Sequence, residues 1–189
     1  EGQGGDKSPI IDSGPDETYV QVDDYYNTGA NNYIRIYTPT DTATECNQSQ
    51  RHDGKWNNQR YMLSTSNDVL YSLTLNNNFA RIEGLQISNS WDEGGSAADT
   101  IYVTGLGSGA DVRISGCILK SLAGGSPSEN AGIDNYSNNS GATVKIWNNI
   151  FIDFNVGSVP SGIWIESNGA QTYVYNNTFH NCTQGIRNA

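Results

Sequence analysis

Short runs of alternating hydrophobic and polar residues follow one another along most of the chain. From residue 33 onward they cover residues 33–37, 61–63 and 69–75, and Gly, Asn, Ser and Thr fill the gaps between them. A period of two is typical of β-strands, and gaps of this composition are typical of turns. No longer stretch follows the 3.6-residue period of an amphipathic helix. The pattern therefore predicts an all-β chain with almost no α-helix.

From residue 80 the chain repeats itself. Residues 80–87 match three later segments, which are 112–119, 144–151 and 173–179. A second motif with a central isoleucine recurs in the same phase, at Ile101, Ile133, Ile163 and Ile186. Two motifs that recur together indicate stacked supersecondary units.

The repeat predicts a parallel β-solenoid of about five to six coils. Each coil would add one strand to each of several parallel sheets, and successive coils would lie about 4.8 Å apart. Three hydrophobic columns would point inward and fill a thin core. The isoleucines of the second motif form one column; the others are Ile82, Ile114, Ile146 and Val174, and Ile87, Leu119, Phe151 and Phe179.

A corner position recurs between two strands of each repeat. It is occupied by Gly84, Gly116, Asn148 and Asn176, and Gly and Asn tolerate the left-handed conformation that a sharp corner requires. The pattern Ile-x-Asn-Asn-x-Phe followed by Gly-Ile resembles the right-handed parallel β-helix repeats of the pectate-lyase-like superfamily, over residues 79–189. Residues 29–36 and 51–56 are similar to stretches in β-helix proteins of phage and environmental bacteria. The resemblance implies a right-handed coil but no single activity, because the superfamily includes lyases, hydrolases, tailspikes and adhesins.

Residues 1–24 differ in composition from the rest. They hold seven acidic residues against one lysine, together with two prolines. We expect them to form an extended acidic N-terminal arm with one strand at residues 18–22. A parallel β-helix domain would follow over residues 25–189, with irregular first coils over 25–78 and regular repeats over 79–189.

Composition and charge exclude several classes of partner. The net charge is −10 and hydrophobic residues make up 35% of the chain, which suits the thin core of a solenoid. We expect no nucleic-acid partner, and anionic membranes are disfavoured, because binding to either requires clustered Lys and Arg. We also expect no membrane insertion, because no apolar run reaches the roughly 20 residues that span a bilayer. The chain does not begin with Met, and we expect a processed, secreted and extracellular protein. Three scattered cysteines form neither a disulfide framework nor a zinc site.

The outward positions of the coils carry the candidate binding residues. Arg81, Arg113 and Lys145 share one column with Tyr173, and like charges one coil apart need a negative neighbour. A bound polyuronide could supply it, and so could Glu83, Asp99, Asp111 or Asp134. Four aromatic residues at outward positions suggest a face on which sugars stack, although they also suit ordinary cross-strand packing; they are Trp147, Tyr175, Tyr102 and Trp164.

Two enzymatic alternatives follow from the resemblance. In a uronate lyase, Arg113 or Lys145 would be the base, and Glu83 and Asp134 would hold a metal such as calcium. However, the Arg-x-Pro-x-x-Arg segment of pectate lyases is absent. A hydrolase needs carboxylates that face one groove, and the acids here are scattered. Outside the lyase alternative we therefore expect no catalytic residue, metal or cofactor.

Two further features bear on assembly and modification. The chain stops at residues 185–189 in the middle of a repeat, with no capping helix, so we expect either a longer parent protein or another copy stacked end to end. Five Asn-x-Ser/Thr sequons are candidate glycosylation sites; they are Asn47, Asn135, Asn138, Asn176 and Asn181.

Three functions remain. We expect an extracellular structural protein whose coils build a fibre or surface assembly by end-to-end stacking. The first alternative is a polysaccharide lyase acting on uronate polymers, or a fragment of one. The second is a non-catalytic glycan-binding or phage tail module.

Overall fold

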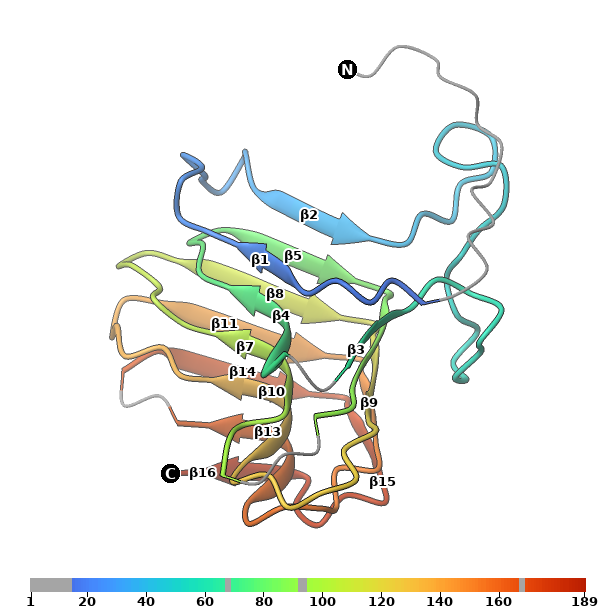
Figure 1. Ribbon diagram of the computed structural model, residues 1–189. Helices are drawn as coiled ribbons and strands as arrows, with labels where there is room; N and C mark the ends of the chain where they lie inside the picture. The colour runs from blue at the N-terminus through green and yellow to red at the C-terminus, as the bar shows by residue number, and fades with distance from the viewer. Residues whose placement is uncertain (1–14, 67–68, 92–94, 167–168) are drawn as a thin grey trace.

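The computed structural model describes residues 15–66, 69–91, 95–166 and 169–189. Within these residues the chain folds entirely into strands and loops, with no helix (Figure 1). It therefore offers no helix that is long and apolar enough to cross a membrane. The prediction of an all-β fold is confirmed.

The strands form three sheets, and all pairings between named strands are parallel. Sheet 1 contains β1 (Val20–Val22), β4 (Tyr71–Leu75), β7 (Asp99–Val103), β10 (Asn130–Asn135), β13 (Pro160–Ile165) and β16 (Ile186–Asn188). Sheet 2 contains β2 (Ile34–Tyr37), β5 (Ala80–Glu83), β8 (Asp111–Ser115), β11 (Thr143–Trp147) and β14 (Gln171–Tyr175). Sheet 3 contains β3 (Leu63–Thr65), β6 (Gln86–Asn89), β9 (Ile118–Ser121), β12 (Ile150–Ile152) and β15 (Thr178–His180).

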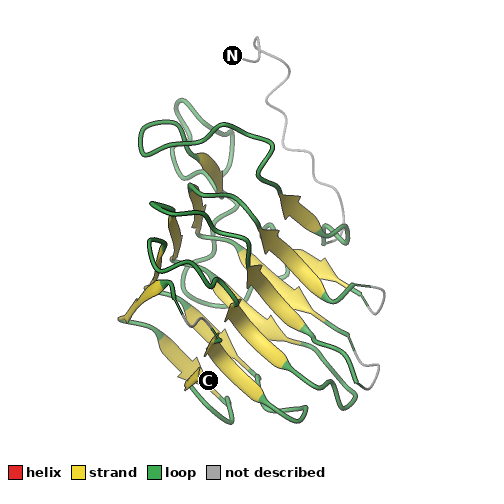
Figure 2. Cartoon of the chain, turned by 90° about the vertical axis from the view of Figure 1, so that its left-hand side faces the viewer, coloured by secondary structure: helices red, strands yellow, loops and turns green. Residues whose placement is uncertain are grey.

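The chain visits the three sheets in turn, so each pass adds one strand to each sheet. This order defines a parallel β-solenoid, with β2 near one end and β16 near the other (Figure 1). The view turned by 90° shows the strands of neighbouring coils lying one above another (Figure 2). The predicted fold class is confirmed.

The three predicted hydrophobic columns are in register. Ile82, Ile114, Ile146 and Val174 pair in sequence across sheet 2. Ile87, Leu119, Phe151 and Phe179 pair across sheet 3, and Ile101, Ile133, Ile163 and Ile186 pair across sheet 1. All except the last member of each column are fully buried. Removing these side chains from water is the main source of stability that the fold offers.

The corner between sheets 2 and 3 has the predicted geometry. Gly84, Gly116, Asn148 and Asn176 all have positive φ, between 53° and 72°. The Asn176 amide donates a hydrogen bond to the Asn148 side chain in the coil before it. The repeated Gly or Asn is therefore explained by the left-handed corner.

An additional asparagine ladder runs inside this corner. Asn149 is buried, its Oδ1 accepts a hydrogen bond from the Cys117 N–H, and its Nδ2 donates to the Ile114 carbonyl. Asn177 in the next coil donates in the same way to the Ile146 carbonyl, and its Oδ1 accepts from Asn149. The ladder satisfies backbone groups that the sharp corner leaves outside the strands.

The first coil contains a long excursion between sheet 2 and sheet 3. Residues 38–62 connect β2 to β3, whereas only residues 84 and 85 connect β5 to β6. The excursion folds back on the corners: the Arg51 Nε donates to the Thr38 carbonyl at 3.1 Å, and His52 reaches Gly116. It therefore covers the sheet 2–sheet 3 corner of the first coils.

The strand predicted in the N-terminal arm lies at β1, two residues shorter than predicted. It pairs with β4 and so belongs to sheet 1. Residues 1–14 of the predicted arm lie outside the described residues.

Candidate binding faces and a buried carboxylate cluster

The basic column predicted from the repeat lies on the outer face of sheet 2. Arg35, Arg81, Arg113, Lys145 and Tyr173 pair in sequence from β2 to β14. Parallel register places these side chains about one strand spacing, ~4.8 Å, from one another.

One carboxylate neutralises the centre of this column. Asp111, at the start of β8, lies 3.0 Å from Arg81, 2.6 Å from Arg113 and 3.2 Å from Lys145. The negative neighbour that these cations require is therefore supplied within the protein, by one of the four acids that the sequence suggested.

The cations raise the acidity of Asp111. Burial by itself would raise the pKa of this carboxyl, but the hydrogen bonds from Arg113 and Lys145 and the charge of Arg81 outweigh it, and the pKa lies below its ordinary value. Arg81 lies deepest, with 7% of its side chain exposed, and its guanidinium carbon is 4.8 Å from the centre of the Tyr33 ring. Arg113 and Lys145 are therefore the members of this group that face solvent.

The strands of sheet 2 carry an excess of positive charge. These strands carry four cations, Arg35 and the three around Asp111, against two carboxylates, Asp111 and Glu83, the second of which pairs with Arg35 at 2.7 Å. The Glu45 carboxylate also reaches the outer face of this sheet, where it accepts a hydrogen bond from the Tyr37 hydroxyl. Four cations against three carboxylates leave a local balance of +1, in contrast with the net charge of −10 for the whole chain. An anion is attracted to this face more strongly than to the protein as a whole.

Two aromatic rings lie beside the basic column. Trp147 and Tyr175 pair in register on β11 and β14, with ring centroids 5.9 Å apart and planes at 11°. Tyr175 is half exposed. The two rings form a flat apolar strip next to Lys145, in the column predicted from the sequence.

The other two predicted aromatic residues lie on sheet 1 instead. Tyr102, Asp134, Trp164 and Arg187 pair in sequence on that sheet. The single aromatic face suggested by the sequence is therefore divided between two sheets. Trp164 was expected to be exposed, and that expectation is wrong: only 5% of it is accessible, and the Arg187 guanidinium lies 4.9 Å from its ring centre.

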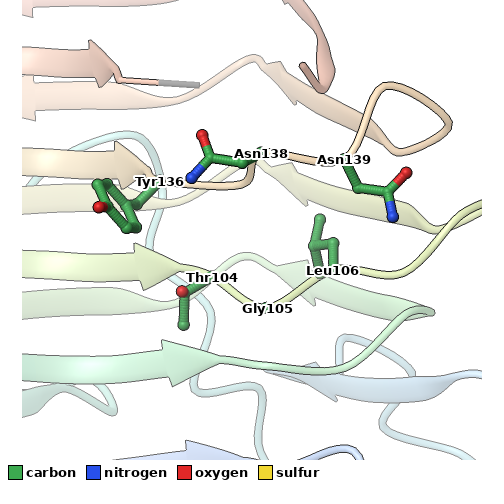
Figure 3. Close-up of a pocket in the computed structure, with 6 residues that line it drawn as sticks. All are labelled: Thr104, Gly105, Leu106, Tyr136, Asn138 and Asn139. Atoms are coloured by element: carbon green, nitrogen blue, oxygen red, sulfur yellow. The ribbon is translucent and has the colours of Figure 1, made fainter. Parts of the chain in front are cut away.

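Tyrosines stack along the outer face of sheet 1. The Tyr71 and Tyr102 rings lie 4.3 Å apart and nearly parallel, and Tyr136 follows 6.1 Å from Tyr102. Beside Tyr136, a shallow hollow of about 440 Å³ lies at the ends of β7 and β10 (Figure 3). Apart from the Tyr136 phenol, its lining contains no ionisable side chain; it consists of Thr104, Gly105, Leu106, Tyr136, Asn138 and Asn139.

Three acids meet next to this tyrosine stack. One carboxylate oxygen from each of Asp99, Glu129 and Asp134 lies within 4.8 Å of the other two. Asp99 is fully buried, Asp134 is 2% exposed and Glu129 is partly exposed. No described Lys or Arg forms an ion pair with any of the three.

Their surroundings disfavour the ionised forms. Burial, together with the charges of Glu166 and Glu129, raises the pKa of Asp134 to about 8. Burial and the charge of Asp134 also raise the pKa of Asp99 well above its ordinary value, against a hydrogen bond from the Ala131 N–H. Burial and the charge of Glu166 also raise the pKa of Glu129, against the charge of Arg187. Clustered carboxylates that are not ion-paired bind either protons or a cation.

Buried polar atoms without a hydrogen-bond partner are concentrated in β7, β10 and β13, around these acids. On β7 they are Asp99 Oδ2 and Thr100 Oγ1, on β10 Asn130 Oδ1 and Asp134 Oδ1, and on β13 Ser161 Oγ and Trp164 Nε1. Such atoms are rare in folded proteins and each requires an explanation. Their concentration marks this part of sheet 1 as a candidate site.

The structure separates the residues proposed for a lyase. Glu83 lies on sheet 2, where it pairs with Arg35, whereas Asp134 lies on sheet 1. The prediction that these two hold one metal is therefore wrong. Only Glu83, Arg113 and Lys145 share a face.

The sequence suggested Asp99 only as a possible negative neighbour of the basic column, and it did not suggest Glu129. A signal was present, because Ala97 and Glu129 pair as Ile101 and Ile133 do, at the same spacing along the chain. Extending the repeat by four residues towards the N-terminus would have aligned Glu129 with Ala97, two residues before Asp99.

The sequons differ in accessibility. Asn135 is fully buried and donates to the Thr172 hydroxyl, so its amide cannot accept a glycan in the folded protein. The side chains of the other four are exposed: Asn47, Asn138, Asn176 and Asn181. All three cysteines are free thiols, and Cys117 is fully buried.

Comparison of the chain with models of protein families, with curated proteins and with solved structures finds no match.

Proposed function

We propose that this protein binds an acidic polysaccharide on the outer face of sheet 2 without cleaving it. One observation carries the proposal: the surplus of cations around Asp111 lies directly beside the stacked rings of Trp147 and Tyr175.

The chemistry of this face suits a uronate polymer. Arg113 and Lys145 can donate charge-assisted hydrogen bonds to sugar carboxylates. Trp147 and Tyr175 can cover the apolar faces of pyranose rings, since aromatic side chains offer a large, flat apolar surface. A polymer can contact several coils at once, so weak contacts add up along its length.

The same contacts argue against a lyase. A lyase base must release its proton, and Arg113 and Lys145 both donate to Asp111. The hydrogen bond to Asp111 also raises the pKa of Arg113. Arg113 is therefore poorly suited to take a proton from a sugar.

Isothermal titration calorimetry with polygalacturonate tests the proposal. We expect binding that weakens with added salt and weakens further when the polymer is methyl-esterified. Lys145→Ala and Trp147→Ala should each reduce the affinity about tenfold or more, equivalent to about 1.4 kcal/mol. Lys55→Ala, which removes the same charge from the exposed part of the excursion, is the matched control.

Two outcomes would contradict the proposal. Equal affinity for the charged and the esterified polymer would show that the cations are not used. Release of unsaturated uronate products by the wild type, but not by Lys145→Ala, would show that the protein is a lyase and not a binding protein.

A screen of sulfated and neutral polymers should give weaker binding to the neutral ones.

A second candidate is end-to-end assembly into a fibre. It is favoured by one observation: within the described residues, β14, β15 and β16 pair on one side only. A second copy could extend these three strands. Electron microscopy and sedimentation of the purified protein test it, with filaments supporting assembly and monomers at all concentrations contradicting it.

The proposed ligand also bears on the location of the protein, its superfamily and its glycosylation. A polysaccharide ligand would suit an extracellular, secreted protein of the pectate-lyase-like superfamily, and it would also suit a phage tail module. Exposed sequons such as Asn138 would carry glycans only in a host with the required machinery.

A further inference from the structure

We propose that Asp99, Glu129 and Asp134 form a binding site for one divalent cation of the Ca²⁺ type, which links β7 to β10. The site lies on sheet 1, away from the polysaccharide face proposed on sheet 2, so it is independent of that function. Besides the meeting of three acids, the proposal rests on the two carboxylate oxygens that are buried without a hydrogen-bond partner, Asp99 Oδ2 and Asp134 Oδ1.

The spacing of the oxygens fits a single cation. One oxygen from each acid lies within 4.8 Å of the other two. Two ligands on the same Ca²⁺ ion, each at about 2.4 Å, can be at most about 4.8 Å apart. The three oxygens can therefore bind one ion with small side-chain adjustments.

Backbone pairing holds the three acids in place. The Ala98 N–H donates to the Glu129 carbonyl at 3.0 Å, which fixes Glu129 beside the start of β7. Tyr102 pairs with Asp134 in register, and the Asp99 Oδ1 accepts from the Ala131 N–H at 2.7 Å. Because Oδ1 is used in this way, Asp99 has Oδ2 available for an ion. A site built on paired strands is pre-organised for binding.

Burial selects a small ligand. Asp99 Oδ2 and Asp134 Oδ1 have no contact with solvent, so a sugar ring cannot reach them. A single cation is small enough to bind between them, and Glu129 is the partly exposed member of the cluster. The described residues supply no ion-pair partner for the three acids, and a divalent ion would remove most of their mutual repulsion.

The ligand chemistry indicates the type of metal. All the donors are carboxylate oxygens, which suit Ca²⁺, Mg²⁺ or Mn²⁺ and not the softer ions that prefer Cys and His. Ca²⁺ accepts irregular sets of six to eight oxygens, whereas Mg²⁺ demands a near-ideal octahedron. An irregular cluster from two neighbouring strands therefore favours Ca²⁺.

Three measurements on the full chain test the site. Calorimetry with CaCl₂ should give one ion per chain, with weaker binding of MgCl₂. Thermal unfolding should occur at a higher temperature in CaCl₂ than in EDTA, since an ion that binds only the folded state stabilises it. Tb³⁺ should show sensitised emission, because Tyr71 and Tyr102 pair in register with Asp99 and Asp134.

Variants separate this site from other acidic groups of the chain. Asp134→Asn should weaken Ca²⁺ binding about tenfold or more and abolish the shift in unfolding temperature. Without Ca²⁺ it should be about as stable as the wild type at neutral pH, because the amide is a neutral group of the same shape as the protonated carboxyl that the raised pKa of Asp134 favours. Glu129→Gln, at a partly exposed position, provides the same test should Asp134→Asn fail to fold. Asp24→Asn, on the exposed β1–β2 loop, is the matched control and should keep the full response.

Two results would overturn the proposal. One is the absence of binding heat, of Tb³⁺ emission and of stabilisation at millimolar Ca²⁺. The other is unchanged Ca²⁺ binding in both Asp134→Asn and Glu129→Gln. Lys145→Ala should retain Ca²⁺ binding, so failure of the polysaccharide proposal would leave this one intact.

Discussion

The ring of Phe151 on β12 lies directly against the backbone of Gly132 on β10. A Cβ atom added to Gly132 would lie 2.5 Å from the Phe151 Cδ1 and 2.6 Å from the Gly162 carbonyl oxygen. Phe179 and Gly162 repeat the same contact one coil later. The Gly-Ile motif therefore requires its glycine for close packing between two sheets.

Gly132→Ala should destabilise the protein by about 1–3 kcal/mol, because neither a buried ring nor a backbone carbonyl can move away cheaply. Urea denaturation followed by tryptophan fluorescence measures the loss. Gly124→Ala is the control, since a Cβ there would meet no atom within 4 Å. Equal stability of the two variants would show that the ring adjusts freely.

Asn149→Ala should cost about 2 kcal/mol, because it leaves the Cys117 N–H without its acceptor in a buried corner. Asn149→Asp should not restore stability, since it places an oxygen opposite the Ile114 carbonyl, to which the amide now donates. Chemical denaturation measures both. Asn155→Ala, at an exposed position, should change stability by less than about 0.5 kcal/mol.

His52 makes the attachment of the long excursion sensitive to pH. The Gly54 N–H donates to its Nδ1, so the Nε2 carries the hydrogen that is donated to the Gly116 carbonyl at 2.7 Å. Burial, aided by the charge of Arg51, lowers the pKa of this imidazole below 6.5. As the pH falls below about 6.5, the unfolded state binds a proton before the folded state does, so stability decreases until the folded pKa is reached.

His52→Gln should remove this part of the pH dependence, because the amide can keep a bond to Gly116 and does not titrate. Free energies of unfolding measured between about pH 7.5 and pH 5 test it. His180→Gln, at an exposed position, should keep the wild-type slope. A wild-type slope in His52→Gln would assign the effect to other groups.

Asp111→Asn should reduce stability by about 2 kcal/mol. The main reason is that the Arg81 side chain, which is only 7% exposed, loses its carboxylate partner. The loss of stability should be larger at low salt, because the repulsion among the three cations is then less screened. Lys145→Ala should cost less than about 1 kcal/mol, since its side chain is 34% exposed. Thermal unfolding at two salt concentrations distinguishes these cases.

The repeat in the sequence determined the β-solenoid, its inward columns and its corners. It also placed Arg81, Arg113 and Lys145 in one column and Trp147 beside Tyr175. These features depend on the alternation of side chains along a strand and on the register between neighbouring strands. Both are expressed directly in residue spacing.

Only the tertiary structure decided which outward residues meet and which stay accessible. Trp164 occupies an outward position yet is covered by Arg187, and the four aromatic residues predicted to share one face lie on two different sheets. Asp99 and Asp134 are 35 positions apart in the sequence, at different points of neighbouring strands, yet their carboxylates converge. Repeat spacing encodes which residues pair between strands, whereas burial and convergence depend on side-chain directions and on loops that come from elsewhere in the chain.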